Sequence, residues 1–597
     1  MNTNLLRRIS SLSLISILLF LFLSCKKNVD TIADAGNVLP DLVTKVTSSV
    51  SGFVTDQNNA AVTGAIVKAG TSTTLTNRYG YFEFKNIQVV KEAATVEVSY
   101  AGYFKGIKTY MATEGKAAFF RIKLLQKTIA GTINATSGGA VSLSNGLNIS
   151  LPANAVKNST TGLAYTGTVN IAAQFIDPTS NEIIKTMPGD LRGIDAGGFI
   201  KGLTSYGMMA VELTGASGEL LQIAGGKKAT ITFPVPASIN ATAPAIIPLW
   251  YFDESNGLWK EEGAATKTGN NYVGDVSHFS FWNFDSPASY AHFNINLVTD
   301  NNIPLSYVAV KISHATFGEN FRMGYADSTG YISGAVPLNK DLKLEIFASG
   351  CDIPVYSTNF SVTNDDPAVK TITIPNTALL ISTISGTVHN CNDLPVSNGF
   401  IMMFGGNQYM RIPIKNDGTY SFSSILCNSV STETFIATDQ NSSTENNPVT
   451  YDLVPGVNTL PVIKACQAST VEFIDYSING AHYHYEAPAT TFNYQPYSSV
   501  TTIIANVQPV NTSFWISNGV PFAAGVDTPL GVFGEAVYSD PGGMISVSLA
   551  NPIMVHITEF GPVGQFISGN FSGTMVRQMP PLTQYNIQCN FRVRRLL

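Results

Sequence analysis

Charged residues are scarce in this sequence. Only 13% of its 597 residues are charged, and the net charge of −6 at pH 7 provides no basic surface for a phosphate backbone. We therefore expect no nucleic-acid partner. Hydrophobic residues make up 44% of the chain, so the low charge does not indicate a disordered tail either.

The chain also lacks the short motifs of common enzyme classes. It contains no H-E-x-x-H, G-x-S-x-G, P-loop or G-x-G-x-x-G pattern. A glycosidase would not be recognised in this way, because its two catalytic carboxylates are close in the folded protein without a fixed spacing in the sequence. We expect a protein that is not an enzyme and needs no cofactor, with a carbohydrate-binding or glycan-active surface protein as the alternative.

Runs with helical periodicity are rare as well. Short alternating segments lie between turns rich in Gly (50 residues), Asn, Ser and Thr, which is typical of β-strands. At ~100–200 residues per domain, the length predicts about four or five domains. We therefore predict an all-β chain, organised as a string of β-sandwich domains.

The N-terminus has the features of a secretory signal. Arg7 and Arg8 precede an apolar run from Ile9 to Leu23, which is short for a membrane span of ~20 residues. The run ends in Leu23-Ser24-Cys25, which resembles a bacterial lipobox, although Phe22 stands where that pattern usually has leucine. The resemblance implies a signal peptide over residues 1–24 and lipidation of Cys25. An ordinary signal peptide with an incidental cysteine is the alternative.

A lipid on Cys25 would make the membrane a partner and residues 25–48 a tether. Lys26 and Lys27 follow the cysteine, with no aspartate to indicate inner-membrane retention. We therefore expect a protein held on the bacterial outer membrane, on its periplasmic or its surface side.

Five further cysteines follow Cys25, and export permits them to form disulfides. An odd number leaves at least one thiol free or paired between chains. Cys391, Cys427 and Cys466 fall in one predicted domain, so we predict a bridge from Cys391 to either of the other two. No C-x-x-C spacing supports a metal site instead.

Residues 49–126 have the pattern of a small sandwich, with turns at Asp56–Asn59 and Tyr79-Gly80 between alternating strands. The segment resembles the carboxypeptidase-regulatory-like module, a transthyretin-like sandwich. The residues that carry the likeness are Gly52, Asp56, Val62, Ala65, Val67, Gly80, Phe82 and Phe84. The resemblance implies a spacer or binding module without peptidase activity.

A looser version of this pattern recurs twice, over residues 288–378 and 379–466. In each copy, a turn that contains an aspartate precedes a strand with a tyrosine, at Asp327–Tyr331 and at Asp417–Tyr420. Such aspartates can bind calcium through oxygen ligands. Turn formation explains them without a ligand.

Residues 127–287 read as a larger sandwich that ends in a Trp-rich stretch. An Asn145-Gly146 turn joins two strands, the second of which ends at Pro152. This layout resembles the ZU-type β-sandwich of netrin receptors, ankyrins and death-domain adaptors. Some members cut their own chain within a His-Phe-Ser sequence, which implies the same role here for His278, Phe279 and Ser280.

Self-cleavage would begin when the Ser280 hydroxyl attacks the Phe279 carbonyl while His278 takes the proton. The alternative is a strand whose Phe279 fills the core while His278 and Ser280 face outward, since period-2 alternation alone produces that pattern.

Residues 467–597 form a predicted C-terminal β domain with many aromatic residues. Its segment from Gly564 to Thr574 is similar to a terminal domain of Bacteroidetes-type lipoproteins, which implies no known activity. His482 and His484 share one strand face with Glu486, so they are weak candidates for metal ligands beside the simpler reading as a solvated face. Four tyrosines in this domain could stack on sugar rings, but packing in the hydrophobic core explains them more simply: Tyr483, Tyr485, Tyr494 and Tyr497.

Together these patterns predict a membrane-anchored β-sandwich lipoprotein that binds, adheres or scaffolds at the cell envelope. A glycan or a protein is its expected partner. Nothing in the sequence identifies that partner.

Overall fold

The computed structural model describes residues 38–595, apart from short gaps at 317–319, 349–350, 406–407, 443, 469–471, 480, 488–489, 498–499, 508–511, 519–522, 526, 531–533, 541–542, 548–551, 563–564 and 578–582. Nearly all regular structure is strand. Within the described ranges, the helical elements are the single-turn helix α2 (Ile183–Thr186) and the 3-10 turn η1 (Asn376–Ala378). The predicted all-β class is confirmed. No described helix is long and apolar enough to cross a membrane.

Sandwich 1 packs the sheet β4-β1-β7 against the sheet β3-β2-β5-β6. Alternate residues of each strand point inward, and Val54, Val67 and Val96 are fully buried between the sheets. Its strands are β1 (Lys45–Thr55), β2 (Ile66–Ala69), β3 (Ser72–Leu75), β4 (Tyr81–Val90), β5 (Ala94–Ser99), β6 (Gly106–Tyr110) and β7 (Ala117–Lys123).

Sandwich 2 is one 13-stranded sheet. Residues from strands far apart in the sheet order share one core, so the sheet folds back on itself. Its strands are β8 (Ile129–Asn134), β9 (Gly139–Ser142), β10 (Asn148–Leu151), β11 (Val156–Asn158), β12 (Thr168–Ile176), β13 (Arg192–Ile194), β14 (Ile200–Gly215), β15 (Leu220–Ile223), β16 (Ala229–Pro234), β17 (Ile246–Asp253), β18 (Leu258–Thr268), β19 (Asn271–Val276) and β20 (Phe281–Ala288).

Sandwich 3 packs the strands β28-β27-β23-β24 against the small sheets β25-β22-β29 and β21-β26. Its strands are β21 (Tyr290–His292), β22 (Ile295–Thr299), β23 (Ala309–His314), β24 (Asn320–Tyr325), β25 (Tyr331–Ile332), β26 (Ala335–Pro337), β27 (Leu342–Phe347), β28 (Tyr356–Phe360) and β29 (Lys370–Ile374).

Sandwich 4 follows the same plan, with one sheet centred on β30 and another on β31 and β34. Its strands are β30 (Ile381–His389), β31 (Gly399–Gly405), β32 (Gln408–Ile414), β33 (Thr419–Ile425), β34 (Ser431–Asp439), β35 (Thr444–Glu445), β36 (Val449–Leu453), β37 (Gly456–Thr459) and β38 (Ile463–Lys464), and β39 (Gln467–Ala468) pairs with β35.

The C-terminal domain is an 11-stranded sheet, and Leu75 of sandwich 1 contributes to its core. Its strands are β40 (Phe473–Ile478), β41 (Ala481–Glu486), β42 (Thr490–Tyr497), β43 (Val500–Val507), β44 (Thr512–Asn518), β45 (Asp527–Leu530), β46 (Gly534–Asp540), β47 (Gly543–Val547), β48 (Ile553–Phe560), β49 (Phe566–Arg577) and β50 (Gln584–Arg594).

Sandwiches 1, 3 and 4 share a local construction that explains the recurring sequence pattern. In each, a glycine with positive φ packs against a carbonyl of the first strand: Gly80 against Val54, Gly330 against Leu297, and Gly418 against Val388. The first strand also runs parallel to a late strand, as β1 with β7, β22 with β29 and β30 with β37.

The carboxylates of Asp327 and Asp417 accept hydrogen bonds from backbone N–H groups of their own turns. Asp327 Oδ1 accepts the N–H groups of Thr329 and Tyr331 at 2.7 and 3.0 Å. Asp417 Oδ1 accepts the N–H of Thr419 at 3.0 Å. Turn formation therefore accounts for both residues.

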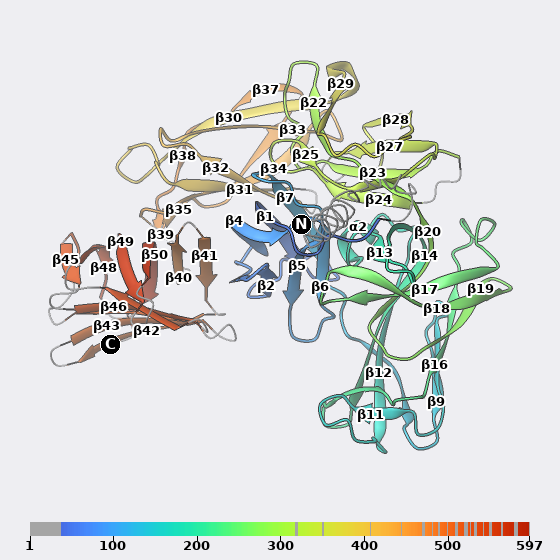
Figure 1. Cartoon of the computed structure of the whole chain (residues 1–597). Helices are drawn as coiled ribbons and strands as arrows, with labels where there is room; N and C mark the ends of the chain where they lie inside the picture. The colour runs from blue at the N-terminus through green and yellow to red at the C-terminus, as the bar shows by residue number, and fades with distance from the viewer. Residues whose placement is uncertain are drawn as a thin grey trace, which may run out of the picture.

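Sandwich 1 is the centre of the molecule (Figure 1). The C-terminal domain (red) and sandwich 2 (teal and green) lie on opposite sides of it, and sandwiches 3 and 4 (yellow to orange) lie above it in this view. The sheet of sandwich 1 continues into sandwich 3, because β7 pairs with β24 through Phe119 and Tyr325.

The predicted tether is shorter than residues 25–48. The carbonyl oxygen of Val38 accepts the N–H of Ile200 at 2.8 Å, Leu42 packs on a small apolar cluster, and β1 already begins at Lys45. A hydrogen bond, an apolar contact and the start of β1 therefore hold the last part of this segment on the body. Residues 1–37, which include Cys25, lie outside the described residues.

Candidate functional site

The His278-Phe279-Ser280 segment lies between β19 and β20, where a glutamine holds it. Gln222 accepts the Phe279 N–H through Oε1 at 2.7 Å and donates from Nε2 to the Phe279 carbonyl oxygen at 2.9 Å. The Phe279 ring is buried in the core of sandwich 2. The Ser280 hydroxyl donates to the Phe281 carbonyl oxygen at 3.0 Å. The Ser280 hydroxyl is thus bonded to the carbonyl group of Phe281. Self-cleavage requires it to attack the carbonyl carbon of Phe279 instead.

Aromatic rings hold the His278 side chain in place. Its ring centroid lies 4.7 Å from that of Tyr251 and 5.1 Å from that of Trp282. Partial burial lowers the pKa of His278, which keeps the imidazole neutral at pH 7, as a general base requires. Its Nε2 atom lies 3.6 Å from a carboxylate oxygen of Glu262. Self-cleavage and an intact strand both stay predictions, and the bonding of the Ser280 hydroxyl favours the intact strand.

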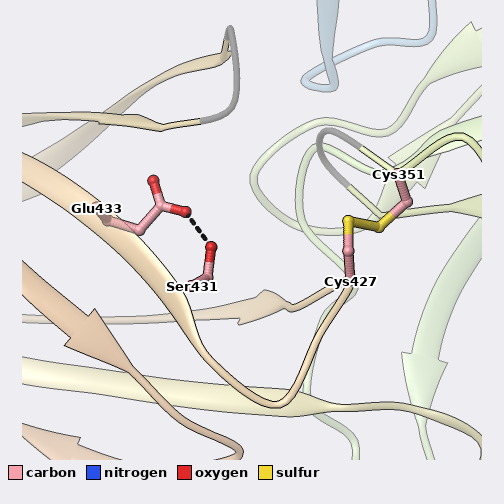
Figure 2. Close-up of a disulfide and its surroundings, with 4 residues drawn as sticks. All are labelled: Cys351, Cys427, Ser431 and Glu433. Atoms are coloured by element: carbon pink, nitrogen blue, oxygen red, sulfur yellow. Dashed lines mark hydrogen bonds between the residues drawn. A yellow bond between two sulfur atoms is a disulfide. The ribbon is translucent and has the colours of Figure 1, made fainter.

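A disulfide joins Cys351 of sandwich 3 to Cys427 of sandwich 4 (Figure 2). Their Cα atoms are 5.5 Å apart, although 76 residues separate them in the sequence. Ile425, at the end of β33, packs into the core of sandwich 3 and so brings Cys427 to its partner. In the same view, the Ser431 hydroxyl donates to Glu433 at 2.7 Å.

The predicted bridge from Cys391 to Cys427 is therefore wrong. That prediction assumed pairing within one domain, whereas Cys427 lies where two sandwiches meet. Cys391 and Cys466 are free thiols in this structure. Cys589 is buried, and burial raises its pKa well above the usual range.

The predicted metal and sugar residues lie on β41 and β42. The side chains of His482, His484, Tyr494 and Tyr497 lie outside the described residues. Among the residues that the structure does describe, no three His, Cys, Asp or Glu side chains gather as metal ligands. Tyr485 is only 1% exposed and belongs to the domain core, with Tyr483 packed beside it. Neither of these two rings offers an open platform for a sugar.

Aromatic and arginine side chains fill the junction of sandwiches 1, 3 and 4. The Phe53 ring stacks on Tyr409, with centroids 5.6 Å apart. The Arg121 guanidinium lies 5.3 Å from the centroid of Phe119 and donates to the Tyr409 carbonyl oxygen at 3.1 Å. Arg411 lies 4.3 Å above the Phe400 ring. The ring of Tyr307, from sandwich 3, lies 4.7 Å from that of Phe119. Cation–π contacts strengthen when they are shielded from water, so this aromatic junction holds three sandwiches together.

An ionic cluster occupies the junction of sandwiches 1, 2 and 3. His292 Nδ1 lies 2.9 Å from Asp365, and its Nε2 lies 3.4 Å from Glu92. The buried Arg192 pairs with Asp190 at 2.7 Å and approaches Glu92 at 4.0 Å. The pKa of His292 is raised, chiefly by its hydrogen bond to Glu92. The ionic junction therefore contains a histidine whose charged form is favoured by its carboxylate neighbours.

A mostly apolar cavity of about 100 Å³ lies between sandwich 1, the α2 segment and sandwich 3. Lys108 lies at its wall, and its Nζ donates to the carbonyl oxygens of Ile184 and Met187 at 2.8 and 2.6 Å. Burial lowers the pKa of Lys108 to about 7. Because the amine is engaged by two carbonyl groups, it ties α2 to β6.

The sequence contains a weak signal for the aromatic junction. Arg121 and Arg411 stand in strands that otherwise contain mostly apolar and aromatic residues. An arginine in such a strand is unusual unless its charge is paired or stacked. The ionic junction has no such signal, since Glu92, His292 and Asp365 resemble ordinary surface residues.

No family model matches this chain. Over 162 residues it is 30% identical to cartilage intermediate layer protein 2 of Mus musculus, across 26% of this chain and 14% of that protein. This chain thus spans only a small part of that relative's length.

Two solved structures show distant likeness. The Bacillus anthracis TIE protein matches 70% of this chain and 50% of its own, with 10% identity and a TM-score of 0.14. The shaft pilin SpaA of Lactobacillus rhamnosus GG matches 30% of this chain and 98% of its own, with 7% identity and a TM-score of 0.18. At these values the likenesses carry no functional argument. The fold and its junctions define the chain as a multi-domain β-sandwich protein.

Proposed function

We propose that this protein is a membrane-anchored, non-catalytic lipoprotein that acts in binding, adhesion or scaffolding at the bacterial cell envelope. The observation that carries the proposal is the central place of sandwich 1, which contacts every other domain. Aromatic, ionic and hydrogen-bonded contacts fasten these junctions. Such a body holds several surfaces in fixed relative positions, as a scaffold or adhesion protein requires.

The anchor in this proposal comes from the sequence around Cys25. Val38 is held on sandwich 2, and 13 residue steps separate it from Cys25. At ~3.5 Å per residue, this stretch reaches at most ~45 Å. A lipid on Cys25 would therefore keep sandwich 2 close to the membrane, while the other domains supply binding surfaces.

Cell fractionation of a Cys25→Ser variant tests the anchor. We expect the wild-type chain in the outer-membrane fraction and the variant released or unprocessed, because the serine hydroxyl cannot take the thioether-linked lipid. Cys589→Ser is the matched control, since it also replaces one thiol but lies in the C-terminal core. If the Cys25→Ser chain matures normally and stays in the membrane, the anchor is refuted.

Binding of intact, detergent-extracted protein to a panel of polysaccharides separates the proposal from its glycan alternative. The burial of Tyr485 and the packing of Tyr483 beside it favour a structural role for those tyrosines. Retention of one polysaccharide together with its depolymerisation would replace the proposed function by a glycan-active one. Retention without turnover would identify a glycan as the bound partner.

A further inference from the structure

The ends of two parallel strands bring Cys391 and Cys466 together in sandwich 4. Strand β38 runs beside β30 with Val388 opposite Ile463 and His389 opposite Lys464. Each strand ends at this last pair: Cys391 begins the turn two residues beyond His389, and Cys466 lies two residues beyond Lys464. The backbone contact extends one residue further, because the N–H of Ala465 donates to the His389 carbonyl oxygen at 2.9 Å.

The Cys391 thiol lies against the backbone next to Cys466. Its Sγ donates to the carbonyl oxygen of Ala465, the residue before Cys466, at 3.8 Å. Burial and the neighbouring Cys391 thiol raise the pKa of Cys466 to about 11. The two strands from which the cysteines extend lie ~4.8 Å apart, a spacing within the Cα separation of ~4.4–6.8 Å that a disulfide spans. A bridge just beyond the strand ends therefore needs no movement of β30 away from β38.

We propose that Cys391 and Cys466 form a second disulfide, which joins the turn after β30, the first strand of sandwich 4, to the residue that ends this sandwich. The bond closes sandwich 4 at the border with the C-terminal domain. It also accounts for the odd number of cysteines: two bridges use four of them, and the buried Cys589 remains a thiol. The proposal goes beyond the proposed function and does not depend on it.

The chemistry is a thiol–disulfide exchange with an external disulfide as oxidant. Cys391 is exposed, so its thiolate attacks one sulfur of the oxidant and releases the other as a thiolate. The Cys466 sulfur, after losing its proton, then attacks Cys391 and releases the second thiolate. The two protons pass to the departing thiolates. The protein loses two hydrogens, and the oxidant becomes two thiols.

A metal site is the competing use of two adjacent thiols. Zinc in structural sites takes four ligands. In the described part of the chain, no group of three His, Cys, Asp or Glu side chains is arranged to hold a metal. The neighbouring Asp393 and Lys464 instead pair with one another at 2.6 Å. A disulfide is therefore the outcome that this geometry favours.

Peptide mapping without reduction tests the bond on the full, detergent-extracted chain. Trypsin followed by cleavage after glutamate separates the cysteines, because Arg411, Lys415 and Lys464 lie between Cys391, Cys427 and Cys466. After incubation with oxidised glutathione, we expect the peptide that contains Cys391 to be linked to residues 465–472, two hydrogens lighter than the separate peptides. The linked pair should separate on reduction.

Variants make the result decisive. In Cys391→Ser, we expect Cys466 to become reactive toward a maleimide while the Cys351–Cys427 link persists. In Cys351→Ser, the matched control, Cys427 should become reactive while the Cys391–Cys466 link persists. Circular dichroism checks that each variant keeps its strand content. If glutathione instead adds separately to Cys391 and Cys466, or if both stay reactive after oxidation of the wild-type chain, the proposal is overturned.

Discussion

The backbone N–H of Arg78 lies 2.8 Å from a carboxylate oxygen of Glu486, although 408 residues separate the two in the sequence. The contact joins sandwich 1 to β41 of the C-terminal domain. The Arg78 guanidinium also pairs with Glu445 of sandwich 4. The Tyr485 hydroxyl donates to the Thr73 carbonyl oxygen at 3.2 Å beside it. One turn of sandwich 1 thus binds two later domains.

Removing the Glu486 carboxylate should loosen this contact. Glu486 is 8% exposed, so Glu486→Ala leaves the Arg78 N–H without this acceptor in a buried place. We expect a loss of ~1–3 kcal/mol in unfolding free energy, seen by calorimetry as a lower melting temperature. Asp366→Asn is the control, because it breaks an exposed pair with Lys370 and should change nothing measurable. Equal melting temperatures for Glu486→Ala and Asp366→Asn would contradict this role of Glu486.

The ionic junction should stabilise the protein more at mildly acidic pH. The folded pKa of His292 is raised, chiefly by its hydrogen bond to Glu92, so its contribution is present below the unfolded pKa and is lost as pH rises through the folded value. The groups around it are Glu92, Asp365, Arg192, Tyr290 and Lys91.

The variant His292→Gln isolates this effect. We expect the melting temperature of the wild type to exceed that of the variant by more at about pH 6 than at about pH 8, because the substitution removes the His292 imidazole. Other groups that titrate in this range, such as Lys108, are the same in both chains. His556→Gln is the matched control, since His556 pairs with Asp527 in an exposed place outside the junction. A difference between wild type and His292→Gln that is constant with pH, or that grows toward alkaline pH, would contradict the assignment.

The disulfide between Cys351 and Cys427 should stabilise the pair of sandwiches 3 and 4. On the loop-entropy model, closing a loop of 76 residues is worth about 4–5 kcal/mol. We expect Cys427→Ser to lower the denaturant midpoint of the transition of these two sandwiches. Reduction of a Cys391→Ser chain, which cannot form the second proposed bridge, should have the same effect. A reducing agent that lowers the midpoint of the double variant Cys391→Ser, Cys427→Ser just as far would show that the Cys351–Cys427 bond is not responsible.

Local features of the fold were predictable because they depend on neighbouring residues. The turn at Asn145-Gly146 lies between β9 and β10, as its turn chemistry predicts. The recurring glycine of sandwiches 1, 3 and 4 could also be recognised from its spacing in the sequence. Only glycine suits Gly80 and its counterparts, because these positions combine positive φ with close approach to a carbonyl group.

The junctions were not predictable, because they depend on how whole domains are oriented. Phe119 and Tyr325 alternate like core residues within their own strands, and nothing in either strand shows that they pair with each other. Cys351 and Cys427 likewise lie in different predicted domains, so a rule that pairs cysteines within a domain missed the bond.

The His278-Phe279-Ser280 peptide should remain uncut in the purified full-length chain. The Phe279 N–H and carbonyl groups are both bonded to Gln222, and the Ser280 hydroxyl donates to the Phe281 carbonyl oxygen. An acyl shift would have to break this last bond and turn the hydroxyl toward Phe279. We therefore expect one band on a denaturing gel after prolonged incubation, for the wild type and for Ser280→Ala alike.

The variant Gln222→Ala tests the hydrogen bonds in that argument. It leaves the Phe279 peptide without its two side-chain partners and should lower the stability of sandwich 2 by ~1–3 kcal/mol while the chain stays intact. A wild-type chain that splits between Phe279 and Ser280, with the split abolished in Ser280→Ala and retained in Ser280→Cys, would show that the hydroxyl does reach the preceding carbonyl. Sandwich 2 would then be self-cleaving, because a thiol at that position can make the same attack.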